Sequence, residues 1–229
     1  MYDLCEQLGV SPWHYWSDDP PIKHSSIAFN TSRHCSHGEP SVKYRGLFIN
    51  DELPVLWNWA RDRFDIPSPE PPFQVGMYEK VFEFVLRMKG NYFWPASKLN
   101  HWLISGSSDT VVWSSMFSVD GMNVTNGLPS EPLTGPNQIL ADSMGIVMGT
   151  SHHEPMGRNK EEWDQGGEGP WDWTNKKEMK EWWKYGAERA KGVETMFTMG
   201  MRGDGDSGLE GASKELLEGE SIKVETTDS

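Results

Sequence analysis

Polar, charged and aromatic side chains lie at the carboxyl ends of the predicted strands. They are Asn50, Asp51 and Glu52 after the first strand, Trp94 at the end of the second, Ser151 to Glu154 after the third, and Arg202, Asp204 and Asp206 after the fourth. Because the carboxyl ends of parallel strands share one edge of a sheet or barrel, we expect these groups to lie together. Carboxylates, imidazoles, a guanidinium and an aromatic ring suit acid–base chemistry on a sugar that carries an anionic group. An arginine can bind a carboxylate through two parallel hydrogen bonds.

Each of these patterns also has a simpler interpretation. An Asn-Asp pair after a strand is as common in turns and helix caps as in sites. His152-His153-Glu154 does not have the spacing of a zinc site, because adjacent residues rarely bind one ion and a His-Glu-x-x-His motif is absent. The segment 202–206 (RGDGD) resembles the start of a calcium loop but lacks the bidentate glutamate. No glycine-rich phosphate loop is present. We therefore expect no metal and no cofactor.

The elements that would position these groups alternate between strands and helices. The patterns predict strands over 42–49, 92–94, 145–150 and 194–201, and helices over 54–64, 77–89, 137–143, near 156–164 and over 176–191. Asn175 and Glu178 form a candidate capping box for the last helix. Residues 1–40 read as irregular, and 97–137 fit no regular element. Alternation of this kind predicts βαβ units and a parallel sheet.

Composition limits the class of protein. The 229 residues carry a net charge of −13, which argues against a general nucleic-acid binder. Mean hydropathy is −0.63, and no apolar run approaches the roughly 18 residues of a membrane span. Of the twelve tryptophans, we expect Trp182 and Trp183 to lie in the core or an interface. The two cysteines, Cys5 and Cys35, read as free thiols, and this chain shows no signal peptide.

Four segments in order resemble consecutive motifs of one enzyme family. They are 42–52 (VKYRGLFINDE), 88–96 (MKGNYFWPA), 145–156 (GIVMGTSHHEPM) and 200–206 (GMRGDGD). These segments resemble glycoside hydrolase family 115, the xylan α-1,2-glucuronidases. Residues 8–23 also resemble the stretch that precedes the catalytic barrel of that family. The likeness covers about residues 2–96 and 113–208.

The resemblance implies an α/β fold that is the first half, about four βα units, of a (β/α)₈ barrel. Residues 1–40 would lead into the barrel, 41–206 would form its N-terminal half with an irregular insert at 97–112, and 207–229 would be an acidic, disordered tail. It also implies an extracellular full-length enzyme that can dimerise. Its activity would be the release of (4-O-methyl-)glucuronic acid from xylan or glucuronoxylo-oligosaccharides, with inversion. We expect neither nucleic acid nor a membrane as a partner of this chain.

The resemblance assigns roles to particular residues. Asp206 matches the catalytic acid, and Asp51 matches a second carboxylate of the active site. The substrate-binding positions are Asn50, Trp113, His152 and Arg202. Arg202 would pair with the uronic acid carboxylate.

The sequence departs from the family pattern in three places. Residues 97–112 separate Trp113 from the WPA motif, which suggests a retained intron or another gene-model insertion. The chain begins inside the pattern, and the likeness fades after Asp206, before the glutamate that the family uses as base. We therefore expect this chain alone to be inactive. A non-catalytic carbohydrate-binding remnant and a non-functional gene-model fragment remain alternatives.

Overall fold

The structure is a computed structural model. It describes residues 1–28, 36, 38–49, 54–67, 72–95, 135–150, 152, 154–158, 163 and 169–200. Within these ranges, no helix is both long and apolar enough to cross a membrane. The predicted insert at 97–112 and the predicted tail at 207–229 lie outside the described residues.

Four parallel strands form the sheet, in the order in which they occur along the chain. The strands are β1 (Gly46–Phe48), β2 (Tyr92–Trp94), β3 (Val147–Gly149) and β4 (Thr195–Met196). One row of the register runs from Leu47 to Phe93, Met148 and Thr195. Each strand therefore pairs with the next strand along the chain, as in half of a (β/α)₈ barrel. The predicted α/β architecture with a parallel sheet is confirmed.

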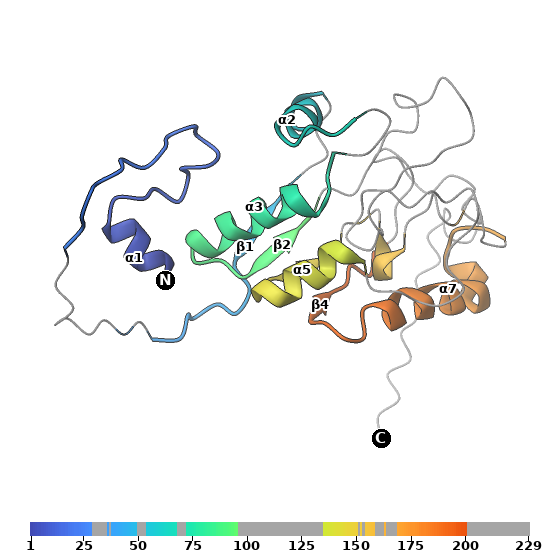
Figure 1. The fold of residues 1–229 in the computed structure, drawn as a ribbon. Helices are drawn as coiled ribbons and strands as arrows, with labels where there is room; N and C mark the ends of the chain where they lie inside the picture. The colour runs from blue at the N-terminus through green and yellow to red at the C-terminus, as the bar shows by residue number, and fades with distance from the viewer. Residues whose placement is uncertain are drawn as a thin grey trace.

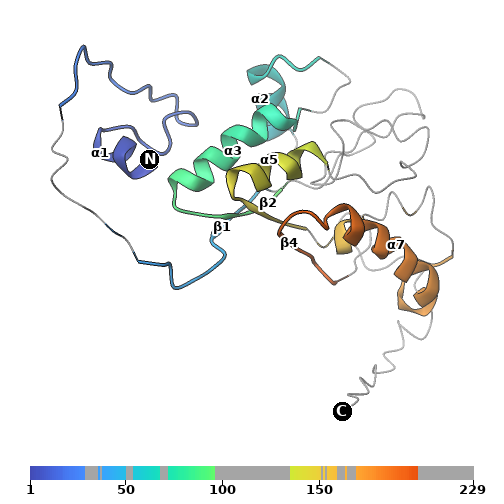
Figure 2. The same cartoon turned by 60° about the horizontal axis from the view of Figure 1, so that its bottom comes forward.

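Two helices, α3 (Val75–Arg87) and α5 (Pro136–Met144), cover one face of the sheet. A further helix, α2 (Val55–Arg63), adds Trp57 and Ala60 to the core on this side, and α7 (Lys176–Arg189) precedes β4. In Figures 1 and 2, α3 and α5 lie side by side over the strands, and α7 lies beside β4. Leu47, Phe93 and Met148 point toward these helices and join the main core. The burial of this apolar surface is the main source of the fold's stability.

Helix α3 shows how the sequence produces this packing. Its buried residues are Met77, Tyr78, Val81, Phe82 and Val85. They recur at three- and four-residue spacing, so they form one stripe along the helix. Phe82 and Tyr78 both contact Phe93 of β2, with ring centroids 5.5 and 5.8 Å away. The stripe thus fixes α3 to the centre of the sheet.

A second apolar cluster lies against α7, apart from the main core. It contains Trp163, Trp171 and Met179, with Trp182 and Trp183 packed against them. The expected core role of Trp182 and Trp183 is confirmed. The cluster thus packs α7 against residues of the segment that connects β3 to α7.

Three local predictions need correction. Residues Tyr2–Gln7 form a helix, α1, inside the stretch predicted to be irregular. The helix predicted near 156–164 does not start at 156, because Pro155–Gly157 form a 3₁₀ turn, η2, and Arg158 is extended. Trp163, within the predicted range, is helical, and residues 159–162 and 164 lie outside the described residues. Met156 and Gly157 both have positive φ, which a continuing α-helix cannot accommodate.

The third error concerns the start of α7. Asn175 makes no capping hydrogen bond with its side chain, and its Nδ2 donates to the Pro170 carbonyl at 3.2 Å. Asp172 has the capping role one turn earlier, where its carboxylate accepts from the Thr174 amide at 2.7 Å in η3 (Trp173–Asn175). Asn175 therefore holds the predicted N-cap position of α7 without a side-chain cap, and the capping side chain, Asp172, belongs to the 3₁₀ turn before it.

Candidate active site

The structure describes one of the predicted site residues, His152. Asn50, Asp51, Trp113, Arg202 and Asp206 lie outside the described residues, so their assignments remain predictions. His152 follows β3 by three residues and is partly buried. It lies at the carboxyl edge of the sheet, the edge at which α/β enzymes place their chemistry.

Backbone hydrogen bonds continue beyond the strands at this edge. The Ile49 amide donates to the Trp94 carbonyl at 3.0 Å, and the Thr150 amide donates to the Met196 carbonyl at 3.2 Å. Ile49 directly precedes Asn50, and Thr150 lies two residues before His152. The ordered framework therefore extends to the start of two of the predicted site segments.

Aromatic side chains line this edge on the face opposite the helices. Phe48 packs on Trp94 with ring centroids 4.6 Å apart. The centroids of the Trp94 and His152 rings are 6.5 Å apart, and the two ring planes are nearly perpendicular, at 87°. Phe48 is about half exposed, at 49%. Among the described residues, nothing accepts a hydrogen bond from the buried Nε1 of Trp94. An aromatic ring beside an imidazole can hold the apolar face of a sugar while the imidazole binds its hydroxyl or carboxyl groups.

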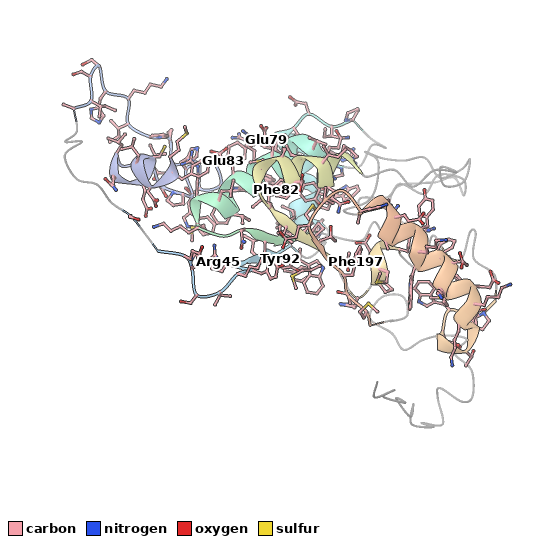
Figure 3. The ribbon with its side chains drawn as sticks, turned by 90° about the horizontal axis from the view of Figure 1, so that it is seen from below. Arg45, Glu79, Phe82, Glu83, Tyr92 and Phe197 are labelled. Carbon is pink, nitrogen blue, oxygen red and sulfur yellow. The ribbon has the colours of Figure 1, made fainter. Side chains whose placement is uncertain are left out.

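Tyr92 fills the same face one layer below. A Cβ added at Gly149 would overlap the Tyr92 hydroxyl, so the ring crosses β3 at the position that has no side chain. Burial raises the pKa of the Tyr92 hydroxyl. Figure 3 shows Tyr92 near Arg45 and the strands, with Phe82 on the side of α3. Gly149 thus allows the aromatic layer that supports Trp94.

The loop that carries His152 is clamped onto α7. A Cβ at Gly186 would overlap the Met156 carbonyl oxygen, which shows how closely the loop approaches the helix. The buried guanidinium of Arg189 donates to the Gly157 carbonyl. Glu154, 1% exposed, lies inside the same loop. The loop is therefore a packed part of the fold.

Arg158 anchors the end of this loop in the second apolar cluster. Its guanidinium carbon lies 3.6 Å from the centroid of the Trp182 ring and 4.6 Å from that of Tyr185. Nη1 donates to the Trp182 carbonyl at 3.4 Å. A cation between aromatic faces is stabilised without exposure to water, so Arg158 serves packing and does not reach the sheet edge.

Charged groups also meet at the opposite, amino-terminal edge. Glu194 accepts hydrogen bonds from Lys43 Nζ at 2.9 Å and from the Tyr44 hydroxyl at 2.7 Å. The hydrogen bond to Glu194 raises the pKa of Lys43 to about 12, and the bond from Lys43 lowers the pKa of Glu194. This contact joins the residues just before β1 to the residue just before β4. It therefore lies at the opposite end of the strands from His152.

No group of three or more histidine, cysteine, aspartate or glutamate side chains within the described ranges could hold a metal ion. The described side chains at the carboxyl edge offer an imidazole and aromatic surfaces. The predicted carboxylates Asp51 and Asp206 lie outside the described residues.

The model of glycosyl hydrolase family 115 matches residues 37–225 of this chain. The chain belongs to glycosyl hydrolase family 115. The match includes every predicted site residue, from Asn50 to Asp206. The family resemblance read from the four motifs is therefore confirmed.

A solved structure extends the comparison. It is a family 115 4-O-methyl-α-glucuronidase with specificity for decorated arabinogalactans, 28% identical to this chain with a TM-score of 0.65. The similarity covers 94% of this chain and 25% of the relative, so this family 115 chain spans a quarter of that relative's length. No curated protein matches the sequence.

Sequence reasoning missed the contacts that hold the edge together. Trp94 was recognised as an aromatic strand end, but its packing with Phe48 and His152 was not predicted. The pairing of Thr150 with Thr198, described below, was also missed. The one available signal was a threonine just beyond each of two neighbouring strands, and that pattern is too common to be informative alone.

Proposed function

We propose that this family 115 protein releases α-1,2-linked (4-O-methyl-)glucuronic acid from xylan by hydrolysis. The observation that carries the proposal is the position of His152 beside Trp94, at the carboxyl edge of a parallel sheet that the family match covers. Sugar-binding and acid–base groups gather at this edge in such folds.

The proposed mechanism inverts the anomeric carbon. Asp206 donates a proton to the leaving oxygen of xylan while a second carboxylate activates water on the opposite face of the sugar. Inverting enzymes hold these two carboxyl groups roughly 6.5–9.5 Å apart to leave room for the water. Asp51 contributes a carboxylate to the site.

The proposed binding groups recognise the uronic acid as an anion and as a ring. Arg202 holds the carboxylate with two parallel hydrogen bonds. His152 and Asn50 bind polar groups of the sugar, and Trp113 stacks on its apolar face. Trp94 adds a second aromatic surface, which is the part of this arrangement that rests on the described geometry.

Two alternatives follow from specific observations. The solved relative has specificity for decorated arabinogalactans, so glucuronic acid on arabinogalactan is a second candidate substrate. Because the chain spans 25% of that relative, we propose that the carboxylate that activates water, which is distinct from Asp51, lies beyond these residues. The chain alone would then bind the sugar without cleaving it, since loss of a general base costs about 10²–10⁴-fold in rate.

Isothermal titration of the 229-residue chain with an aldouronic xylo-oligosaccharide tests the proposal. The matched control is the same xylo-oligosaccharide without glucuronic acid, and a glucuronidated arabinogalactan fragment tests the second substrate. Binding that requires the uronic acid, and that weakens in Arg202→Lys, supports the proposal. Equal binding of the decorated and undecorated oligosaccharides contradicts it. Glucuronic acid released as the β-anomer would establish inversion and overturn the expectation that the chain alone is inactive.

A further inference from the structure

Beyond β3 and β4, a pair of threonines continues the pairing of the two chains. The Thr198 amide donates to Thr150 Oγ1 at 2.7 Å, and the Thr198 hydroxyl donates to the Thr150 carbonyl at 2.5 Å. Thr150 is buried, with 2% of its surface exposed. A side chain thus replaces the backbone acceptor that a regular ladder would use here.

Thr198 also contacts the far end of the loop that carries His152. Its carbonyl accepts a hydrogen bond from the Met156 amide at 3.1 Å. All three of its polar groups are therefore used, two on Thr150 and one on Met156. Thr150 precedes His152 by two residues, and Met156 follows it by four. Thr198 thus ties both ends of the loop 150–156 to one point on the chain after β4.

We propose that Thr198 is a positioning residue for uronic acid binding, acting through His152. By joining both ends of the loop, it fixes where the imidazole stands beside Trp94 and limits the motion of the loop. This inference rests on the proposed function, which assigns His152 and Arg202 to the sugar.

Thr198→Val tests the proposal because valine keeps the shape of the side chain and removes only the hydroxyl. Thr198→Ser restores the hydroxyl. Thr195→Val is the matched control: the Thr195 hydroxyl accepts from Gln138 Nε2 at 2.7 Å, three residues away and on the helix side of the sheet. Both valine variants lose one hydrogen bond of similar length, so we expect a similar loss of stability.

Two readouts separate a positioning role from a structural one. The first, without ligand, is the NMR spectrum of the His152 imidazole in the 229-residue chain. The second is the affinity for an aldouronic xylo-oligosaccharide. We expect Thr198→Val to move the His152 signals and to weaken binding about tenfold. Thr198→Ser and Thr195→Val should retain both the wild-type His152 signals and the wild-type affinity.

The proposal is overturned if Thr198→Val and Thr195→Val give the same His152 spectrum and the same affinity as the wild-type chain. If the wild-type chain binds no uronic acid, the proposed function fails, and the ligand-free spectrum still decides whether Thr198 positions His152. Near-ultraviolet circular dichroism checks that each variant is folded. If Thr198→Val is not, Thr150→Val removes the acceptor of the Thr198 amide from the other strand, and the same two readouts apply.

Discussion

At the scale of single residues, Trp94 connects the described framework with the proposed chemistry. Its ring touches Phe48 on one side and approaches His152 on the other. Its Nε1 is buried and finds no acceptor among the described residues. A buried donor without a partner is costly, so a position of this kind is typical of a site that a ligand or a further segment completes.

Trp94→Leu should weaken binding of the uronic acid about tenfold, because the stacking surface beside His152 is lost. The measurement is the titration with the aldouronic oligosaccharide. Trp16→Leu is the control: Trp16 stacks on Trp59 at 5.2 Å, on the N-terminal segment and away from this edge. Equal losses of affinity in the two variants would argue against a binding role for Trp94.

A second prediction at this scale concerns pH. The pKa of Glu194 is lowered in the folded state, so its contact with Lys43 contributes stability above the ordinary glutamate pKa. That contribution is lost as the pH falls through the folded-state value. The pKa of Lys43 is raised to about 12, so its contribution is present below its ordinary value and disappears as the pH rises through about 12. Lys43→Met should therefore shift the NMR titration of the Glu194 carboxyl toward higher pH.

Lys191→Met is the control for this titration. Lys191 lies three residues before Glu194 and carries the same charge. If both variants move the Glu194 titration equally, a general charge effect explains the shift. The hydrogen bond from Lys43 would then not be its cause.

At the scale of elements, α7 and the His152 loop approach each other closely at Gly186. Gly186→Ala should destabilise the fold by about 1–3 kcal/mol, because the new Cβ would overlap the Met156 carbonyl oxygen. In a helix the same change would otherwise stabilise by up to about 1 kcal/mol, so packing reverses the sign. Urea unfolding followed by tryptophan fluorescence measures the change.

Gly192→Ala is the matched control for this variant, since nothing lies within 4 Å of a Cβ at that glycine. A change within about 0.5 kcal/mol is expected there. If Gly186→Ala is equally neutral, the loop is held less tightly against α7 than its geometry indicates.

The elements also show which features the sequence alone could predict. Helix α3 and strand β2 have local patterns, an apolar stripe and a short apolar run before a proline, and both were predicted to within two residues. The turn at Met156 has no such pattern. A positive φ at a non-glycine residue is held by its surroundings, here Gly186 and Thr198. Those contacts join residues that are distant in the sequence, so local reasoning predicted a helix instead.

For the candidate site, sequence reasoning predicted the positions, and the structure gives the contacts of one of these residues, His152. The strand ends predicted which residues share an edge, and the family motifs assigned their roles. The position of His152 beside Trp94 depends on the register between β2 and β3. Register follows from packing across the whole sheet, which a single segment of sequence does not contain.

At the scale of the whole molecule, the two faces of the sheet differ. Leu47, Phe93 and Met148 are covered by helices, whereas Phe48 and Met196 on the other face are 49% and 41% exposed. Strands β1 and β4 form the two edges of the described sheet. An apolar face beside unpaired strand edges favours association with another chain or segment.

We therefore expect the 229-residue chain to associate as its concentration rises, and Phe48→Glu to reduce that association. A charge on the open face opposes its burial against a second apolar surface, because an ion without a partner is costly to desolvate. Sedimentation velocity over a hundredfold range of concentration measures the effect. Ile139→Glu is the control, since Ile139 is 55% exposed on α5 in the helical layer. Equal suppression by both variants would assign the association to net charge, and no suppression by Phe48→Glu would exclude this face as the surface of contact.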